Sequence, residues 1–254
     1  IKANPAQPLL QVNHPRGSAR SGYFTAVGFE PSTGTVEDPR NWSTRFDALE
    51  VVNGKGVATP TEGIFRDWYG LLNAGLRITG TGNSDSHAAY QGDEVAYPRN
   101  YVRVPSDDLS RFDEASYVAG VKAGHVVVSG CAFLRVSIDG RGPGESLTKS
   151  TGSVELEIEA QAAPWCPLSE LTIVANGAIV HQRELTFSDV DPQNPQRRFK
   201  GRVTLPATRD TWFVVHVRGG SIHPVVTNAR AFAFSNPIYV DADGNSRFDA
   251  LNAR

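Results

Sequence analysis

Short apolar runs separated by polar turns make up the first half of the chain, and such runs are typical of buried strands. The segments predicted as strands in this half are 9–12, 46–53, 77–81, 100–104 and 126–128. A capping box over 59–62 (Thr-Pro-Thr-Glu), with proline at the first helical position, predicts a helix that Gly75 ends. A second helix is predicted over 113–123, with Gly124 as its stop. Alternating strands and helices indicate an α/β domain with a largely parallel sheet.

The pattern changes after about residue 132, where β-branched and aromatic segments follow one another without a helical period. The segments predicted as strands here are 133–138, 153–162, 170–175, 178–183, 199–205, 211–218 and 231–240. Asn176-Gly177, between two of them, is a hairpin turn signal. Such a series of short strands indicates an antiparallel β-sandwich. We therefore expect two domains, an α/β domain over 1–132 and a β-sandwich domain over 133–254.

Composition and charge narrow the class of protein without identifying it. The chain has 254 residues, of which 40% are hydrophobic and 20% charged, as is ordinary for a globular protein. The formal net charge of −2 offers no polybasic surface, so nucleic acid is not an expected partner. No apolar run reaches the length of about 18 residues that a membrane-spanning helix needs.

Two features of the chain bear on its processing and location. It begins with Ile1 and carries no signal-like segment, so we expect a processed or truncated product. Cys131 and Cys166 fit either one disulfide or two buried thiols, because their spacing matches no zinc-binding pattern. The possible disulfide and the β-sandwich favour a periplasmic or secreted protein, and the sequence leaves the location open.

The candidate chemistry begins with Ser-Asp-Ser-His over 84–87, which follows the predicted strand over 77–81. Asp85 and His87 have one residue between them, so both side chains can reach a single cation at the end of that strand. The alternative is a polar turn with an incidental surface histidine. The presence of a second histidine cluster favours the metal site over this alternative.

That second cluster is Asn-His-Pro-Arg-Gly over 13–17, which follows the strand over 9–12. Pro15 biases His14 toward an extended backbone, which suits a ligand at a strand end. Arg16 is a candidate for binding a phosphate or carboxylate. A histidine before proline in a turn is, taken alone, usually structural. Because sites in parallel α/β folds gather at the carboxyl ends of the strands, we expect both clusters at one site.

Several motifs occur in a fixed order along the chain. They are Asn-His-Pro-Arg-Gly over 13–17, Asp-Ala-Leu-Glu-Val-Val-Asn-Gly over 47–54, Trp-Tyr-Gly-Leu-Leu-Asn-Ala-Gly over 68–75, Gly-Thr-Gly-Asn-Ser-Asp-Ser-His over 80–87, Ser-Gly-Cys-Ala-Phe-Leu over 129–134 and Ser-Asn-Pro-Ile over 235–238. As an ordered set they resemble the later half of a PHP-superfamily (polymerase and histidinol phosphatase) metallohydrolase. The branch that they resemble is the carbaryl-hydrolase-like CehA/McbA branch.

The resemblance implies a fold class of α/β plus β, with a partial PHP-type distorted (β/α) barrel over 1–132 and an antiparallel β-sandwich after it. It implies a divalent metal cofactor, zinc first, with manganese or iron as alternatives. The residues that it assigns to metal binding are His14, Asp85 and His87. Asp85, His87 and Arg16 are the implied catalytic residues. Arg16 also becomes a substrate-binding candidate, as do Glu50 and Asn53 on the substrate side or behind the ligands.

The chain departs from the family pattern at its start. No His-x-His occurs in it, and no histidine precedes His14. The chain thus supplies only the later metal-ligand motifs, and we expect a missing N-terminal half or another chain to complete the barrel. The expected function is a metal-dependent hydrolase acting on a phosphate ester or other small ester or carbamate. The alternative is a non-catalytic fragment or binding module whose sandwich contacts carbohydrate or protein. Trp165 or Trp212 would then be stacking residues, although a position in the core is the favoured interpretation of both.

The remaining polar groups carry weaker signals. His125 precedes the strand over 126–128, from which it could face the site. The histidines expected to be structural or solvated are His181, His216 and His223. Asp-Ala-Asp-Gly-Asn over 241–245, with Asp249, is similar to a calcium loop, but its glycine is at the fourth position and not the sixth. A looser calcium site and a plain turn both stay open.

Overall fold

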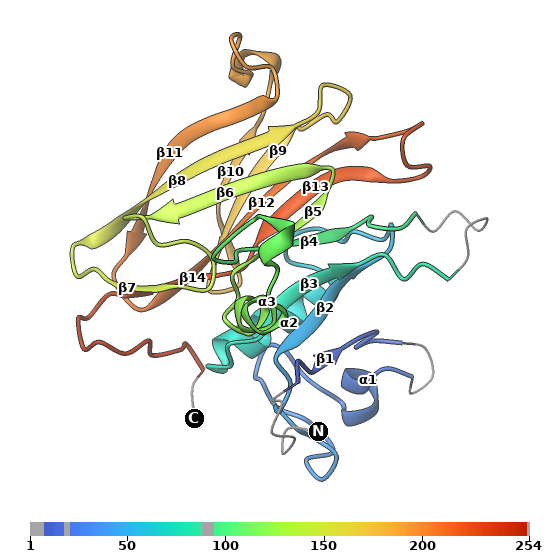
Figure 1. Cartoon of the computed structure of the whole chain (residues 1–254). Helices are drawn as coiled ribbons and strands as arrows, with labels where there is room; N and C mark the ends of the chain where they lie inside the picture. The colour runs from blue at the N-terminus through green and yellow to red at the C-terminus, as the bar shows by residue number, and fades with distance from the viewer. Residues whose placement is uncertain (1–7, 18–20, 88–93, 253–254) are drawn as a thin grey trace.

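The computed structural model describes residues 8–17, 21–87 and 94–252, which form three β-sheets with short helices beside them (Figure 1). One sheet is small and parallel, and the other two consist mainly of antiparallel pairs and are arranged as in a sandwich. The fold is therefore mixed α/β with a sandwich-like β region. Among the residues that the structure describes, the parallel sheet has three strands and does not close into a barrel.

The parallel sheet contains three of the strands that the apolar runs predict. In spatial order they are β1 (Gln11–Val12), β2 (Ala48–Asn53) and β3 (Thr79–Asn83). Helix α2 (Gly63–Asn73) connects β2 to β3, because a parallel pair needs a crossover between its strands. The long segment between β1 and β2 contains α1 (Tyr23–Val27). All three strands consequently end at the same edge of the sheet.

Helix α2 buries the apolar face that the sequence predicts, but it begins later than predicted. The buried side chains of that face are Phe65, Trp68, Leu71 and Leu72. The predicted capping box is wrong, because α2 starts at Gly63 and Glu62 makes no side-chain cap. The backbone N–H of Glu62 instead donates to the Thr59 carbonyl at 3.1 Å, which closes a turn. Gly63 has a positive φ of 54°, a conformation that glycine adopts freely and that separates this turn from the helix.

The larger sheet draws strands from both halves of the chain. Its strands are β4 (Arg99–Val102), β5 (Val126–Gly130), β7 (Ser146–Thr148), β9 (Glu170–Ala175), β10 (Ala178–Glu184), β12 (Thr211–Ser221), β13 (Arg230–Ser235) and β14 (Ile238–Asp241). Strand β5 pairs antiparallel with β4 on one side and with β13 on the other. The prediction that β4 and β5 belong to the parallel sheet is therefore wrong. An apolar run indicates that a strand is buried, but it does not indicate which strand lies beside it.

A smaller antiparallel sheet covers one face of the larger sheet (Figure 1). Its strands are β6 (Ala132–Ile138), β8 (Gly152–Ala162) and β11 (Arg197–Ala207). Buried side chains alternate with more exposed ones along β6 and β8, as expected for a sheet with one covered face. The expected antiparallel β-sandwich is present in this coarse form. Cys131, directly before β6, forms a disulfide with Cys166, which is one of the two alternatives that the sequence leaves open.

A buried polar contact joins α2 to the larger sheet. The Tyr69 hydroxyl lies 2.7 Å from Nε2 of His216 on β12, and both side chains are buried. Burial lowers the pKa of His216 to about 3, and the charge of Arg218 acts in the same direction. Burial also raises the pKa of the Tyr69 hydroxyl. His216 is therefore neutral near pH 7 and has a structural position.

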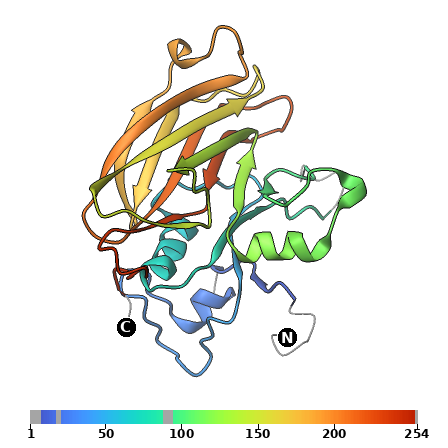
Figure 2. The same cartoon turned by 60° about the vertical axis from the view of Figure 1, so that its left-hand side comes forward.

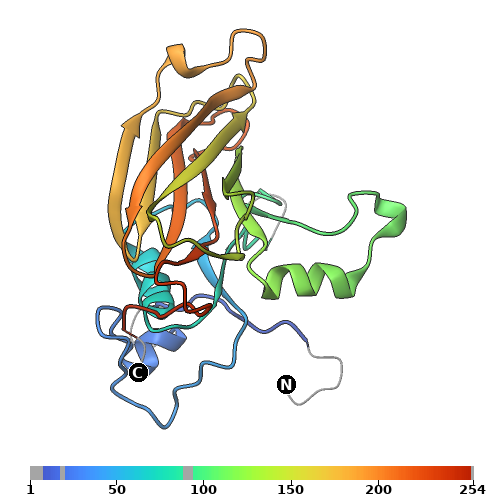
Figure 3. The ribbon, with the colours of Figure 1, turned by 90° about the vertical axis from the view of Figure 1, so that its left-hand side faces the viewer.

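Helix α3 (Glu114–Lys122) and the 3-10 helix η1 (Leu109–Arg111) extend to one side of the sheets. Figures 2 and 3 show this green segment projecting outward beside the sandwich. Asp113 caps α3, as its side chain accepts from the N–H groups of Ala115 and Ser116. Among the described residues, no helix has both the length and the apolar character needed to cross a membrane.

Candidate metal centre

Polar side chains from all three parallel strands meet at the edge where these strands end. His14 follows β1, Glu50 lies on β2, and Asp85 follows β3. The side-chain contacts run from Glu50 to His14 and from His14 to Asp85, and His87 lies on the far side of Asp85. Parallel strands bring residues distant in sequence together at this edge, as they do in other α/β folds.

Asp85 lies between two imidazole rings. Its Oδ1 atom is 3.0 Å from Nε2 of His87 and 3.9 Å from Nε2 of His14. Two ligand atoms on one tetrahedral zinc ion are about 3.3 Å apart, since each lies about 2.0–2.1 Å from the metal. Each separation is near that value, but the donor atoms of the three residues do not all lie within 4.8 Å of one another, so a shared ion requires the two histidine side chains to move toward each other. The exposed fractions are 56% for His14, 34% for Asp85 and 73% for His87, which leaves the cluster open to solvent.

Glu50 is buried next to this cluster and accepts hydrogen bonds from residues at the ends of β1 and β3. Its side chain is 2% exposed, and Oε2 accepts the backbone N–H of His14 at 2.8 Å. Oε1 accepts the side-chain amide of Asn83, the last residue of β3, at 2.9 Å. Nδ1 of His14 lies 3.3 Å from Oε2 of Glu50 and 3.4 Å from Nδ2 of Asn53. Glu50 and Asn53 thus contact the imidazole ring from the side opposite to Asp85.

The backbone at His14 and Asp85 adopts a sparsely populated conformation. Their φ angles are +47° and +50°, in the left-handed region. The prediction that Pro15 holds His14 extended is therefore wrong, because the bond from the His14 N–H to Glu50 stabilises a different turn. A left-handed residue other than glycine costs roughly 1–2 kcal/mol, and such residues are frequent at functional sites.

The Arg16 side chain contacts helix α2 instead of facing the cluster. Its Nε and Nη2 atoms donate to the two carboxylate oxygens of Asp67 at 2.9 and 2.7 Å, and Nη2 also donates to the Phe29 carbonyl at 2.6 Å. The hydrogen bond to Asp67 raises the pKa of the Arg16 guanidinium. In the described part of the chain, no hydrogen bond joins Arg16 to the histidines or to Asp85. Arg16 therefore anchors the turn after β1 to α2.

His125 lies apart from the cluster as well. The charged side chains that act on its pKa are Arg103 and Glu145, which form an ion pair with each other at 3.1 Å. Partial burial, followed by the charge of Arg103, lowers the pKa of His125. The histidine that could face the site on sequence grounds consequently belongs to a different surface.

Two asparagines that were not named as candidate site residues hold β3 in place, although one of them, Asn236, lies in the Ser-Asn-Pro-Ile motif. Asn236, after β13, accepts the Gly80 N–H at 2.8 Å and donates to the Gly80 carbonyl at 2.9 Å. Asn100 on β4 makes the same pair of bonds with Gly82, each at 2.9 Å. The two amides take the place of a neighbouring strand along the free edge of β3. The available signal was Asn100 within a predicted strand, where asparagine is unfavourable.

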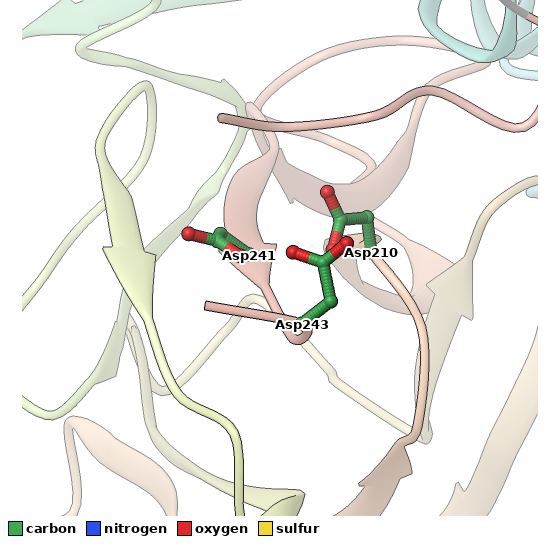
Figure 4. Close-up of side chains that lie close together, drawn as sticks. All are labelled: Asp210, Asp241 and Asp243. Atoms are coloured by element: carbon green, nitrogen blue, oxygen red, sulfur yellow. The ribbon is translucent and has the colours of Figure 1, made fainter. Parts of the chain in front are cut away.

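A second group of possible ligands lies at the end of β14, where Asp210, directly before β12, meets Asp241 and Asp243. Figure 4 shows Asp210, Asp241 and Asp243 close together, and one oxygen from each lies within 4.8 Å of the others. Several of these oxygens already accept hydrogen bonds. Asp241 accepts from the N–H groups of Gly244 and Ser246, each at 2.8 Å, and from the Thr148 hydroxyl at 2.9 Å.

Hydrogen bonding stabilises the charge of Asp241. Burial alone would raise the pKa of Asp241, but the hydrogen bonds from Thr148, Gly244 and Ser246 hold it below its usual value. Asp210 accepts the Ala242 N–H at 2.8 Å in the same way. The contacts are therefore those of a hydrogen-bonded turn. The sequence left this turn and a looser calcium site open as alternatives.

The two tryptophans named as stacking residues differ in accessibility. Trp212 is fully buried and donates from Nε1 to Oδ1 of Asn73 at 2.9 Å, so it belongs to the core. Trp165 is 52% exposed and directly precedes the disulfide-bonded Cys166. Of this pair, only Trp165 offers a face to a ligand.

Part of the chain is similar to a solved structure, the CARDB domain of PF1109 from Pyrococcus furiosus, determined by NMR in solution. The match covers 44% of this chain and 97% of that chain, at 16% sequence identity and a TM-score of 0.24. A likeness at this level carries no argument about function. No family model matches the sequence, and no curated protein matches it.

Proposed function

We propose that His14, Asp85 and His87 bind a divalent metal and that the protein is a metal-dependent hydrolase of the PHP type. The observation that carries the proposal is the position of His14, whose ring nitrogens face different carboxylates. Nδ1 lies 3.3 Å from the buried Glu50, and Nε2 lies 3.9 Å from the more exposed Asp85. Metal-binding histidines are commonly held in this way, with one nitrogen toward an orienting carboxylate and the other toward the ion.

Zinc is the metal that this donor set favours, because imidazole nitrogens and a carboxylate oxygen are among its usual ligands. Manganese and iron are the alternatives. When bound, such an ion polarises a phosphoryl or carbonyl oxygen and supplies hydroxide near neutral pH. His14, Asp85 and His87 would hold the ion, and Glu50 would orient His14. The substrate class, a phosphate ester or other small ester or carbamate, rests on the sequence resemblance.

The proposal includes further strands beside β1. This strand has two residues and lies at the outer edge of the three-stranded sheet. Parallel sheets are normally larger and are covered on both faces, and an uncovered edge strand invites pairing. A missing N-terminal half or another chain would complete a distorted barrel and add the remaining ligands. Arg16 is left out of the catalytic set because Asp67 binds its guanidinium.

The metal is tested first by measuring bound zinc. The purified protein is stripped with a chelator, dialysed against a zinc buffer and analysed by mass spectrometry of the metal. We expect the unaltered protein and His223→Ala to retain zinc and Asp85→Ala to lose it, since His223 is an exposed histidine of the sandwich region. Equal retention by Asp85→Ala would overturn the proposed centre.

The hydrolase is tested separately with the zinc-loaded proteins. Hydrolysis of p-nitrophenyl phosphate and p-nitrophenyl acetate should require zinc and should disappear in Asp85→Ala but not in His223→Ala. If zinc binding depends on Asp85 while both substrates stay intact, the metal centre stands and the hydrolase assignment fails for these substrates.

A second candidate function is a binding module in which the sandwich contacts carbohydrate or protein. The observation that favours it is the 52% exposure of Trp165, because a tryptophan face in this position is available for stacking on a sugar ring. Retention on a carbohydrate array that is lost in Trp165→Ala would support this function. Retention of the variant equal to that of the unaltered protein would contradict it.

A further inference from the structure

A polar pocket lies at the opposite end of β3 from the candidate metal centre. Its volume is about 710 Å³, and its lining includes Arg77, Arg141, Arg247, Ser146, Thr148 and Asp241. Arg77 lies two residues before β3, whereas Asp85 lies two residues after it. The five residues of β3 span about 15 Å at roughly 3.3 Å per residue, so the pocket and the metal centre are separate sites.

Two of the three arginines in this pocket have no carboxylate partner among the described residues. The Arg77 guanidinium donates to the Ser146 hydroxyl at 2.9 Å and lies 4.2 Å from the centre of the Tyr239 ring. Arg141 takes part in no side-chain hydrogen bond or ion pair within that part of the chain. Arg247, by contrast, donates to Asp249 at 2.6 Å.

The carboxylates that line the pocket already have hydrogen-bonding or ion-pair partners. Asp139 pairs with Lys149 at 2.6 Å. Asp241 accepts hydrogen bonds from Thr148 and from two backbone N–H groups. Asp241 keeps its negative charge, and Asp210 and Asp243 lie within 4.8 Å of it, so what Arg77 and Arg141 lack is a direct carboxylate contact. An oxyanion bound in the pocket would supply that contact.

The Arg77 side chain is also held in place before any ligand binds, and the backbone of Arg141 is fixed by a turn. Stacking on Tyr239 and the bond to Ser146 limit the movement of Arg77. Arg141 follows the tight turn at Asp139-Gly140, where both residues have positive φ, and it exchanges two backbone hydrogen bonds of 2.9 Å with Ile138. Arginines that are ordered in this way lose less conformational entropy on binding.

We propose that this pocket binds a small molecule through an oxyanion group, a phosphate, sulfate or carboxylate. A guanidinium presents its N–H donors in a planar fork that matches two oxygens of such a group. Arg77 and Arg141 bind the oxyanion, and the Ser146 hydroxyl is a further hydrogen-bonding group at the same place. The site is independent of the proposed metal centre and takes no part in the hydrolysis.

The test is a titration followed by two-dimensional NMR, with inorganic phosphate, sulfate and citrate as separate probes. All samples carry His87→Ala and are stripped of metal, so that no anion binds through a metal ion. We expect saturable shifts of amides around Arg77 and Ser146 for at least one probe. The probe that binds most tightly distinguishes a phosphate or sulfate group from a carboxylate.

Variants in this background decide whether the arginines carry the binding. Arg141→Gln should weaken the affinity at least about tenfold, since a charged hydrogen-bonding pair is lost. Arg66→Gln is the matched control, because Arg66 is an exposed arginine that lies 3.4 Å from Glu30, outside this pocket. The absence of saturable shifts, or equal weakening by both variants, would overturn the proposal.

Discussion

The two carboxylate-containing clusters of this protein differ in the way their donor atoms are used. The aspartates at 210, 241 and 243 are the more compact group, with an oxygen of each within 4.8 Å of the others. Backbone N–H groups and a threonine hydroxyl already bind several of those oxygens. At the end of the parallel sheet, by contrast, Asp85 faces two imidazole rings and solvent. Compactness alone thus does not define a metal site, because an ion also needs lone pairs that nothing else occupies.

The clusters also differ in what brings their residues together. His14, Glu50 and Asp85 come from three strands and meet because parallel strands end at one edge. Asp241 and Asp243 are near neighbours in sequence, and their loop folds back on its own backbone N–H groups. Asp210 joins them from the turn before β12, so this group also draws on two segments, but its hydrogen bonds are largely those of the turn that follows Asp241.

The largest expected effect separates the clusters by zinc affinity. Asp85→Asn should lower it by more than the about 10- to 100-fold that loss of an outer partner usually costs, because a direct ligand is removed. Asp243→Asn should leave it unchanged. Competition with a chromophoric chelator measures both variants, and a loss in Asp243→Asn without one in Asp85→Asn would show that the aspartate group holds the metal.

The next effect concerns the buried His216 of the sandwich. Its pKa of about 3 lies below that of an unfolded histidine, so the unfolded state binds the proton more readily below pH 6.5. Between pH 6.5 and 4.5 this histidine should lower the free energy of unfolding by roughly 2–3 kcal/mol. Urea unfolding at both pH values should show a smaller loss in His216→Gln. A loss that persists undiminished in this variant, or that His223→Gln also reduces, would assign it to other groups.

A slightly smaller effect is expected for the asparagines that hold β3. Asn236→Ala leaves both backbone groups of Gly80 without their amide partner in a buried place, which should cost about 2 kcal/mol of unfolding free energy. Asn100→Ala should cost less, because Asn100 is only partly buried. Urea unfolding curves measure both costs. Equal costs would mean that burial does not set the strength of the two contacts.

The smallest effect is expected at Asp243. This side chain is exposed, and its bonds go to the neighbouring Asn245, so Asp243→Ala should change the free energy of unfolding by less than about 0.5 kcal/mol. Calcium should leave the melting temperature of the unaltered protein unchanged. A calcium-dependent rise in Tm that Asp243→Ala removes would show that the aspartate loop is an ion site after all.

Local sequence patterns predicted where several strands and helix α2 lie, but not which strands pair with one another. The apolar runs located β1, β2 and β3, and the spacing of Phe65, Trp68 and Leu72 located the buried face of α2. The same kind of run at β5 gave no sign that this strand pairs with β13, about 100 residues later. Strand pairing depends on the register and order of distant segments, which no local pattern contains.

The sequence by itself also placed His14 and the Asp85–His87 pair at strand ends, because apolar runs stop directly before them. Only the tertiary structure decided which polar groups face one another there. Glu50 is buried against His14, whereas Arg16 is bound by Asp67 on α2, although both are charged residues next to the same strands. The physical reason is that α2 and the asparagines at 100 and 236 fix the position of β3 and so decide which polar side chains meet. These contacts join residues far apart in the chain, and a local sequence pattern does not contain them.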